Sequence, residues 1–320
     1  QGYIRDNHPK MPLFVCTTSR QEGKTFFQNF PMDWCHEMAL NPLTDSESHA
    51  LMNAILETEQ TSPQIKVLYD KIVASAKGNP YYIEEVLKSL LANDILIQDK
   101  GEWLLTKSVK KLPLPNSLHN LIVTRFDNLT YQERTLLQVA SVMGKEFSYK
   151  LLHRLYDNKQ KELTPLLETL VTNGFLTKKW VDGDYEFSFS QELTQEVIYG
   201  TLLHKRRTEL HKRIAICLEE IYLSAKPSDV FELLAHHFSH TKEHELAIKY
   251  LYLAANKAMR FCANREALTY YDQIFSLLER IPKDTFVSTD IFFEEWFKAN
   301  DLKTHILEKK AEIFLLIGEY

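Results

Sequence analysis

The stretch "FLTKKWVDGDYEFSF", residues 175–189, decides the fold of the middle of this chain. Polar and apolar residues alternate on both sides of Asp182-Gly183, which is the pattern of strands with one buried face. An Asp-Gly pair is typical of a two-residue turn, because that turn needs backbone conformations that these residues tolerate. The stretch therefore predicts a β-hairpin.

Three helical patterns precede this hairpin. The first, "TYQERTLLQVASVMG", begins with Thr130 and has Glu133 three residues later, which is the signature of a capping box. The other two are "SYKLLHRLY" and "ELTPLLETLVTNG". Three helices followed by a hairpin predict a winged-helix domain, a relative of the helix-turn-helix, and we place it at residues 116–205.

The segment upstream, residues 45–115, is predicted to be a helical domain with one hairpin. Apolar residues recur there at helical spacing, and Asp45 or Ser46 is expected to cap the first helix. Two apolar runs flank Asp99-Lys100-Gly101, which predicts a tight turn between two strands. The Pro-rich "KKLPLPNSL" marks the boundary with the next domain.

Within this domain, "AKGNPYYIEEV" (residues 76–86) predicts a break between two helices. Gly78 is expected to end one helix and Pro80 to open the next, because proline fits the first helical turn. Tyr81 and Tyr82 follow directly, and by spacing they suit either the core of the domain or the wall of a ligand site.

The last part, residues 206–320, is predicted to consist of helices alone. In "HELAIKYLYLAANKAMRFCANREALTYYDQIFSLLERIPKD", small residues on one helix are expected to face small residues on the next, as in tetratricopeptide-like repeats. The expected contacts are made by Ala247, Ala254, Ala258 and Ala267, with Tyr250, Tyr270 and Leu277 between them. The final "ILEKKAEIFLLIGEY" is expected to begin the next, truncated repeat.

Residues 1–44 are interpreted as the C-terminal remnant of a larger core. "MPLFVCTTSR" (residues 11–20) predicts a buried strand, and a lone buried strand needs a sheet that the rest of the chain does not supply. We therefore expect the chain to be a segment of a longer protein.

Composition favours a globular, cytoplasmic chain. Its 320 residues suit two or three domains, and 38 basic against 43 acidic residues give a net charge of −5, which argues against a main role in binding nucleic acid. The 4 cysteines form no paired motif, so a reducing compartment is expected. No apolar run reaches the roughly 18 residues that a membrane span requires.

Two local motifs suggest ligands but have plainer explanations. "EGKT" (residues 22–25) resembles the end of a phosphate-binding loop, yet Thr18 stands where that loop needs glycine. His236, His240 and His244 are spaced by four and could share a helix face with a metal ion. Packing in the apolar stretch is the favoured interpretation, so no metal site is predicted.

Basic residues also give no clear nucleic-acid or catalytic signal. The run "HKRRTELHKR" (residues 204–213) is interpreted mainly as a solvated helix face. The third helix of the winged-helix domain balances its lysines with glutamates, whereas a helix that reads DNA needs a basic surplus. No catalytic motif is recognised, so catalysis within the segment is not predicted.

Taken in order, seven stretches resemble the later half of the STAND-type, AAA-related ATPase region of class III adenylate and guanylate cyclases, including soluble adenylyl cyclase-like proteins. The same region occurs in some sensor kinases and transcription regulators. The stretches are "LFVCTTSRQE", "MALNPLTDSESHALM", "GNPYYIEEVLKSL", "LPNSLHNLIVTRFDNL", "LLQVASVMGKEF", "FSFSQELTQEVIYGTLL" and "RTELHKRIAICLEE". The resemblance covers nearly the whole chain and implies a mainly α fold: a remnant of an α/β P-loop ATPase core, a helical lid, a winged helix and helical repeats.

The resemblance also implies residue roles. Arg20 matches the arginine that closes the sensor strand near the terminal phosphate, and Gly78, Asn79 and Pro80 match the lid turn near the adenine. Gln191 replaces a histidine that in related switches reports bound nucleoside diphosphate, which puts nucleotide sensing through this domain in doubt. ATP or ADP with Mg²⁺ is implied for the intact parent, and no cofactor for the segment alone.

The first functional hypothesis is therefore a regulatory segment of a nucleotide-dependent ATPase switch. It would follow an ATPase core and a possible cyclase domain in the same chain, and its repeats would bind a protein partner. The alternatives are a segment of a STAND-type transcription regulator or sensor kinase, and a repeat scaffold without nucleotide control.

Overall fold

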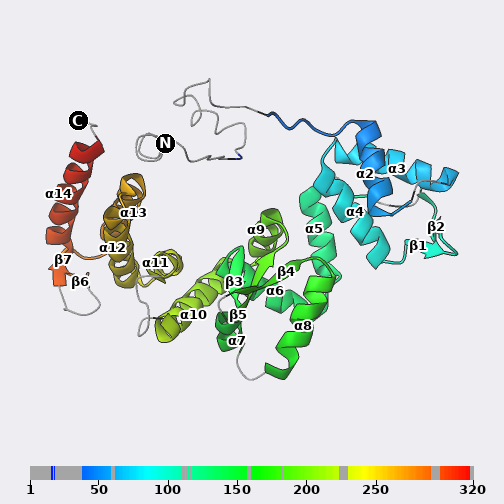
Figure 1. The fold of residues 1–320 in the computed structure, drawn as a ribbon. Helices are drawn as coiled ribbons and strands as arrows, with labels where there is room; N and C mark the ends of the chain where they lie inside the picture. The colour runs from blue at the N-terminus through cyan, green and yellow to red at the C-terminus, as the bar shows by residue number, and fades with distance from the viewer. Residues whose placement is uncertain are drawn as a thin grey trace.

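The computed structural model describes residues 16, 18, 38–58, 62–109, 112, 114–115, 117–156, 160–181, 183–222, 230–289 and 296–317. The described elements are mostly helices with three small antiparallel sheets, which confirms the expected mainly α fold (Figure 1). The predicted strand at residues 11–20, the "EGKT" motif and Arg20 lie outside the described residues.

The N-terminal domain, which we call the lid, has three helices and a hairpin. Its elements are α2 (Asp45–Ile55), α3 (Pro63–Ala76), α4 (Pro80–Ala92), β1 (Leu96–Asp99) and β2 (Glu102–Leu105). The cap of α2 was wrongly assigned to Asp45 or Ser46: Thr44 caps the helix and forms a capping box with Glu47. The β1–β2 hairpin is confirmed, with positive φ at both turn residues, Lys100 and Gly101.

The middle domain has the order of elements expected for a winged helix. They are α5 (Leu118–Asp127), α6 (Tyr131–Met143), β3 (Glu146–Ser148), α7 (Tyr149–Leu155), α8 (Gln160–Thr172), β4 (Leu176–Val181), β5 (Asp184–Phe189) and α9 (Glu192–Thr201). The capping box of Thr130 with Glu133 is confirmed at the start of α6. β5 lies between β4 and β3, so the predicted hairpin gains a third strand that the sequence pattern did not indicate.

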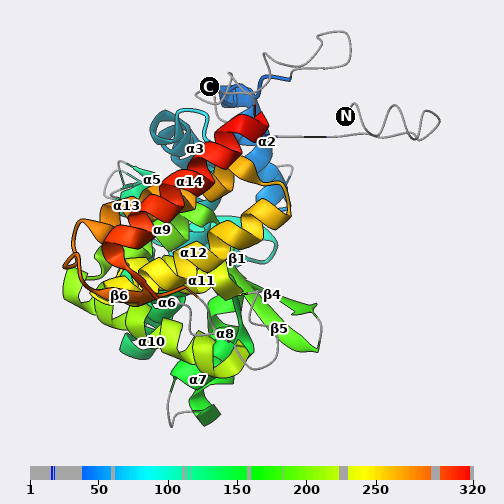
Figure 2. The same cartoon turned by 90° about the vertical axis from the view of Figure 1, so that its left-hand side faces the viewer.

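The C-terminal region packs its helices side by side (Figure 2). It contains α10 (His204–Tyr222), α11 (Phe231–Ser239), α12 (His244–Arg260), α13 (Asn264–Leu278), β6 (Phe286–Ser288), β7 (Trp296–Lys298) and α14 (Ala299–Ile317). The prediction of helices alone was wrong, because β6 and β7 form a hairpin whose Val287 is fully buried. The four predicted alanines are buried, but Tyr271, and not Tyr270, fills the core between α12 and α13.

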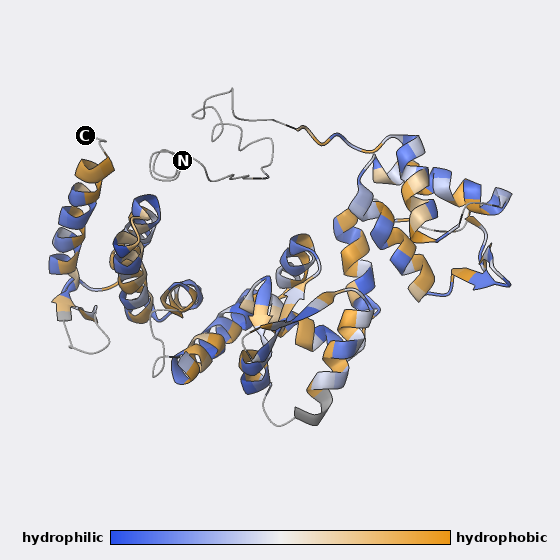
Figure 3. Cartoon of the chain, viewed as in Figure 1, coloured by the Kyte–Doolittle hydropathy of each residue, from blue (hydrophilic) through white to orange (hydrophobic). Residues whose placement is uncertain are grey.

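Among the described residues, the buried side chains form two separate cores. The lid core runs from Met52 to Leu121, and the second core runs from Phe126 to Ile313 through both the winged helix and the repeats. Helix α5 contributes Leu121 to the first core and Phe126 to the second. Hydrophobic residues alternate with hydrophilic ones along the helices of both parts (Figure 3). The winged helix and repeats therefore share one body, and α5 joins it to the lid.

Among the described helices, we find none with the length and apolar content needed to cross a bilayer.

Candidate functional site

The predicted break between α3 and α4 lies beside Pro42 and Leu43, where the chain enters the lid. Lys77 ends α3 in the left-handed conformation, and Gly78 follows with φ +74°. The amide of Leu43 donates to the carbonyl of Gly78 at 2.9 Å. A Cβ on Gly78 would lie 2.5 Å from the carbonyl oxygen of Leu43, so only glycine fits without movement of the backbone. The turn at Lys77 and Gly78, which we call the hinge, is thus packed directly against Pro42 and Leu43, where the chain enters the lid.

The next residues begin α4, as predicted. The side-chain oxygen of Asn79 accepts from the amide of Tyr82 at 3.2 Å, and Pro80 occupies the first helical position. The Tyr82 side chain is buried, and its hydroxyl donates to the carbonyl of Pro115 at 2.6 Å. Of the two tyrosines whose role the sequence left open, Tyr82 therefore belongs to the lid core.

The second tyrosine links the lid to the winged helix. The Tyr81 hydroxyl lies 2.9 Å from the Thr194 hydroxyl, which is buried in the first turn of α9. Gln191 immediately precedes α9; its side chain is exposed and does not cap the helix. Burial raises the pKa of Tyr81, and the Thr194 hydrogen bond and the Arg125 charge partly offset that rise. The contact between Tyr81 and Thr194 therefore joins the helix that begins at Pro80 to the helix that follows Gln191. Pro80 and Gln191 are 111 positions apart in the sequence.

A buried ion pair reinforces the same contact. Glu85 on α4 is 1% exposed and pairs with the guanidinium of Arg125 on α5, whose side chain is 10% exposed. Arg125 also donates to the carbonyl of Asn173 at 2.6 Å and lies 4.7 Å from the centre of the Phe175 ring. Lys88 adds a second cation 3.0 Å from Glu85. Burial lowers the pKa of Arg125, because the charged guanidinium is partly removed from water.

The sequence held a signal for this pair that pattern analysis missed. Glu84 and Glu85 are adjacent in a helix whose buried face includes Ile83 and Val86. Adjacent residues of a helix point in different directions, so one of the two carboxylates must lie nearer the buried face. The partner could not be named, because Arg125 is 40 residues away and lies in a different element.

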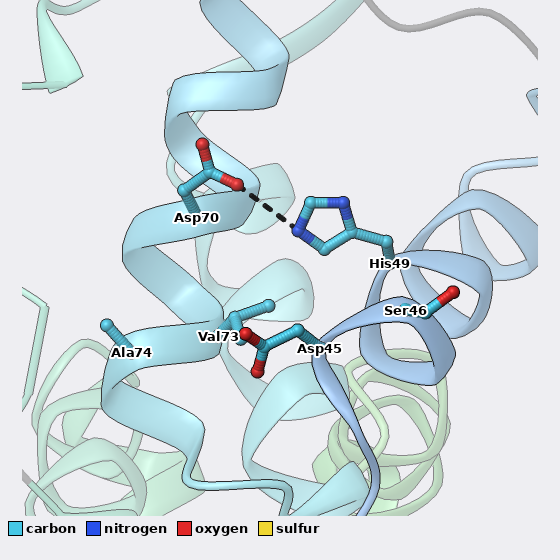
Figure 4. Close-up of a pocket in the computed structure, with 6 residues that line it drawn as sticks. All are labelled: Asp45, Ser46, His49, Asp70, Val73 and Ala74. Atoms are coloured by element: carbon cyan, nitrogen blue, oxygen red, sulfur yellow. Dashed lines mark ion pairs between the residues drawn. The ribbon is translucent and has the colours of Figure 1, made fainter.

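An open depression of about 420 Å³ lies between α2 and α3 (Figure 4). His49 Nε2 is 3.3 Å from a carboxylate oxygen of Asp70 on α3, and Asp45 and Ser46 lie on α2 with His49. The Ser46 hydroxyl is turned away from His49 (Figure 4). Ser46, His49 and Asp70 therefore do not form a nucleophile with its base and the group that orients it. The depression gives no chemistry that we assign.

Histidines gather between α10 and α11. The sequence spacing had placed His236 and His240 with His244, but the structure places His211 of α10 beside them instead. His211 is 1% exposed, so the interpretation of residues 204–213 as a mainly solvated face was wrong at this position. The described residues thus include one group that could hold a metal ion, and it lies outside the lid.

Comparison with known proteins gives distant relatives. No protein-family model matches the chain. An uncharacterised protein of Rhizobium meliloti (strain 1021) is 26% identical over 211 residues, which cover 64% of this chain and 19% of that protein. The peroxide stress-activated histidine kinase mak3 of Schizosaccharomyces pombe is 24% identical over 294 residues, 86% of this chain and 12% of the kinase. This chain therefore spans less than a fifth of each relative.

Among solved structures, the chain is similar to a Signal Transduction ATPase with Numerous Domains (STAND) protein with a tetratricopeptide repeat sensor from Pyrococcus horikoshii. The match covers 88% of this chain and 39% of that one, at 12% identity. Its TM-score of 0.38 is too low to show a shared fold.

Proposed function

We propose that this chain is the regulatory lid, winged-helix and repeat segment of a larger cytoplasmic signalling protein. The observation that carries the proposal is an unbroken line of contacts from the entering chain to the winged helix. Leu43 binds the hinge at Gly78, the hinge begins α4, and α4 binds the winged helix through Tyr81 and Glu85.

This arrangement suits the transmission of a movement. A shift of the chain at Leu43 would displace the start of α4, because the two backbones are in van der Waals contact and share a hydrogen bond. Two polar contacts then connect α4 to α9 and α5, and a buried polar pair tolerates few alternative geometries. The winged helix and the repeats share one core, so the movement would reach the surface that binds a protein partner.

In this proposal, the nucleotide is bound mainly by the ATPase core that the resemblance implies. In the described lid, Pro42 and Leu43 lie against Gly78, and the Asn79 side-chain oxygen accepts from the amide of Tyr82. Nucleotide binding by Gly78, Asn79 and Pro80 stays a prediction. ATP or ADP with Mg²⁺ would be held by the ATPase core that the resemblance implies, with Arg20 near its phosphates. The role of Gln191 in nucleotide sensing stays a prediction.

For the output of the whole protein, we favour a sensor kinase over a cyclase. The support is the similarity to a histidine kinase along 86% of this chain. A cyclase remains the alternative that the resemblance alone would have favoured.

The test uses the intact protein with its natural flanking sequences. Hydrogen exchange of α4, α5 and α9 is measured without nucleotide, with ADP and with a non-hydrolysable ATP analogue, and histidine phosphorylation and cyclic nucleotide production are assayed in parallel. We expect exchange at residues 81–85 to depend on the nucleotide, and phosphohistidine to be the product.

The matched variants are Arg125→Gln and Arg154→Gln. Arg125 joins the lid to the winged helix, whereas Arg154 pairs with Glu220 on the exposed surface. The nucleotide response should be lost in the first variant and kept in the second. Equal exchange with and without nucleotide in the unaltered protein would refute the switch, and a cyclic nucleotide product would refute the kinase assignment alone.

A further inference from the structure

Four histidine rings meet at the contact between α10 and α11 in the C-terminal region. His211 lies in α10, His236 and His237 lie in α11, and His240 is the residue directly after the end of α11, which packs beside α10 (Figure 2). His211 and His237 are each 1% exposed, whereas His236 and His240 face solvent. The cluster therefore has a buried side and an open side.

The rings are close enough to act together. The centre of the His211 ring is 4.4 Å from that of His240 and 5.6 Å from that of His236, and the last two are 4.6 Å apart. One ring nitrogen from each of these three residues lies within 4.8 Å of the others. His236 and His240 share a helix face because they are four residues apart.

We propose that His211, His236 and His240 bind one divalent transition-metal ion of the Zn²⁺ type. In tetrahedral coordination with Zn–N bonds of about 2.0–2.1 Å, ligand nitrogens lie roughly 3.3 Å apart. The three nitrogens need to approach one another by about 1.5 Å or less from their present limit of 4.8 Å, which side-chain rotation can supply. Imidazole is a preferred ligand for Zn²⁺ and its neighbours in the transition series.

The hydrogen bonds already prepare one ligand. Nδ1 of His240 lies 2.8 Å from the carbonyl oxygen of His236, and because a carbonyl only accepts, Nδ1 carries the hydrogen. The lone pair is then on Nε2. A metal-binding histidine usually donates its other N–H to such an acceptor, which fixes the ring and its tautomer.

The buried ligand, His211, has a similar support. Its Nδ1 lies 2.9 Å from Nδ1 of His237, and its Nε2 lies 3.0 Å from the Tyr199 hydroxyl. Binding through Nε2 would replace the Tyr199 contact and keep His237 as the acceptor that orients the ring. His211 is 1% exposed, and its imidazole must be neutral to act as a metal ligand.

The surroundings limit the strength of the site. The group of three contains no carboxylate, and the Arg207 guanidinium lies 4.6 Å from the centre of the Tyr199 ring next to His211. Three neutral ligands beside a positive charge should bind a divalent ion less tightly than a closed site with thiolates. The fourth position would be open to water or to a side chain of a partner. A bound ion would fasten α11 to α10, and α10 in turn packs against α6 and α7 of the winged helix.

The test titrates metal ions alone into the 320-residue chain after treatment with a chelator. Calorimetry with Zn²⁺ should show one site per chain, and Zn²⁺ should raise the melting temperature. Co²⁺ distinguishes the ligands: nitrogen ligands give visible d–d bands, whereas ligation by any of the 4 cysteines of the chain would add a thiolate charge-transfer band in the near ultraviolet.

The variants are His240→Gln and His236→Gln, with His204→Gln as the control at the exposed start of α10. Each of the first two should weaken binding about 100-fold, since even residues that only support a ligand cost 10–100-fold when they are replaced. The control should bind as the unaltered chain does. Melting temperatures in chelator verify that all variants fold. The proposal is overturned by no single-site binding, by equal binding in every variant, or by a thiolate band.

Discussion

Removal of Arg125 should uncouple the lid from the winged helix. In Arg125→Met, the hydrophobic stem is kept and the guanidinium is lost, so the Glu85 carboxylate stays buried without its main partner. Two further contacts disappear with the guanidinium, the hydrogen bond to Asn173 and the contact with the Phe175 ring.

The expected cost follows from the burial of the pair. Breaking a buried ion pair from one side costs about 3–5 kcal/mol, because a charge is left in a poorly hydrated place. Lys88 remains 3.0 Å from Glu85 and is itself about two-fifths exposed, so it offsets part of the loss. We therefore expect the lower limit, about 3 kcal/mol in the free energy of opening the contact between α4 and α5.

Hydrogen exchange followed by mass spectrometry measures this quantity for the two helices separately from the repeats. A loss of about 3 kcal/mol corresponds to exchange faster by about two orders of magnitude in α4 and α5. Exchange in α12 and α13 should stay unchanged, since these helices belong to the other core. The double variant Glu85→Gln/Arg125→Met should recover about 2 kcal/mol, because the buried charge is gone.

The control is Arg154→Met, which removes an exposed partner of Glu220 and should change opening by less than about 0.5 kcal/mol. If Arg125→Met leaves exchange of α4 and α5 within threefold of the unaltered chain, the pair does not hold the lid. If the double variant is no more stable than the single one, the buried charge is not the cause.

Two further substitutions test the hinge and the lid core. Gly78→Ala should destabilise the lid by about 3 kcal/mol or more in thermal unfolding, through positive φ and overlap with Leu43, whereas Gly101→Ala, with open space around it, should cost only about 1 kcal/mol. Equal effects would show that the overlap is relieved. Burial raises the pKa of Tyr69 to about 12, and its buried hydroxyl has no hydrogen-bond partner among the residues that the structure describes. The unfolded state therefore ionises first, so stability relative to Tyr69→Phe should fall between pH 10 and 12 by about 1.4 kcal/mol per unit. Tyr131→Phe, at an exposed position, should show no such change.

Local patterns predicted the elements well where the signal lies in neighbouring residues. The turn at residue 183, the helix start at Pro80 and the capping box at Thr130 are present as predicted. Each depends on backbone conformations or hydrogen bonds within about four residues, which the sequence displays directly. β3 and the β6–β7 hairpin were missed because strands of three residues are too short for a periodic pattern.

Contacts between elements were beyond the reach of the same patterns. The sequence named Gly78 and Gln191 by resemblance but gave no reason to connect their helices through Tyr81 and Thr194. The spacing of four residues grouped His236 and His240 with His244. In the structure, the packing of α10 places His211 beside the first two instead. A residue on another helix has no fixed sequence offset, so periodicity cannot select it.

The sequence by itself determined the mainly helical fold, the winged-helix hairpin, the break at Gly78 and the helix pair with small facing residues. These follow from propensity, caps and periodicity, which act over one or two turns of chain. Only the tertiary structure decided that α5 is shared between two cores, that Glu85 meets Arg125, and that His211 completes the histidine group. Those facts depend on which helix faces pack together, and many distant side chains set that choice jointly.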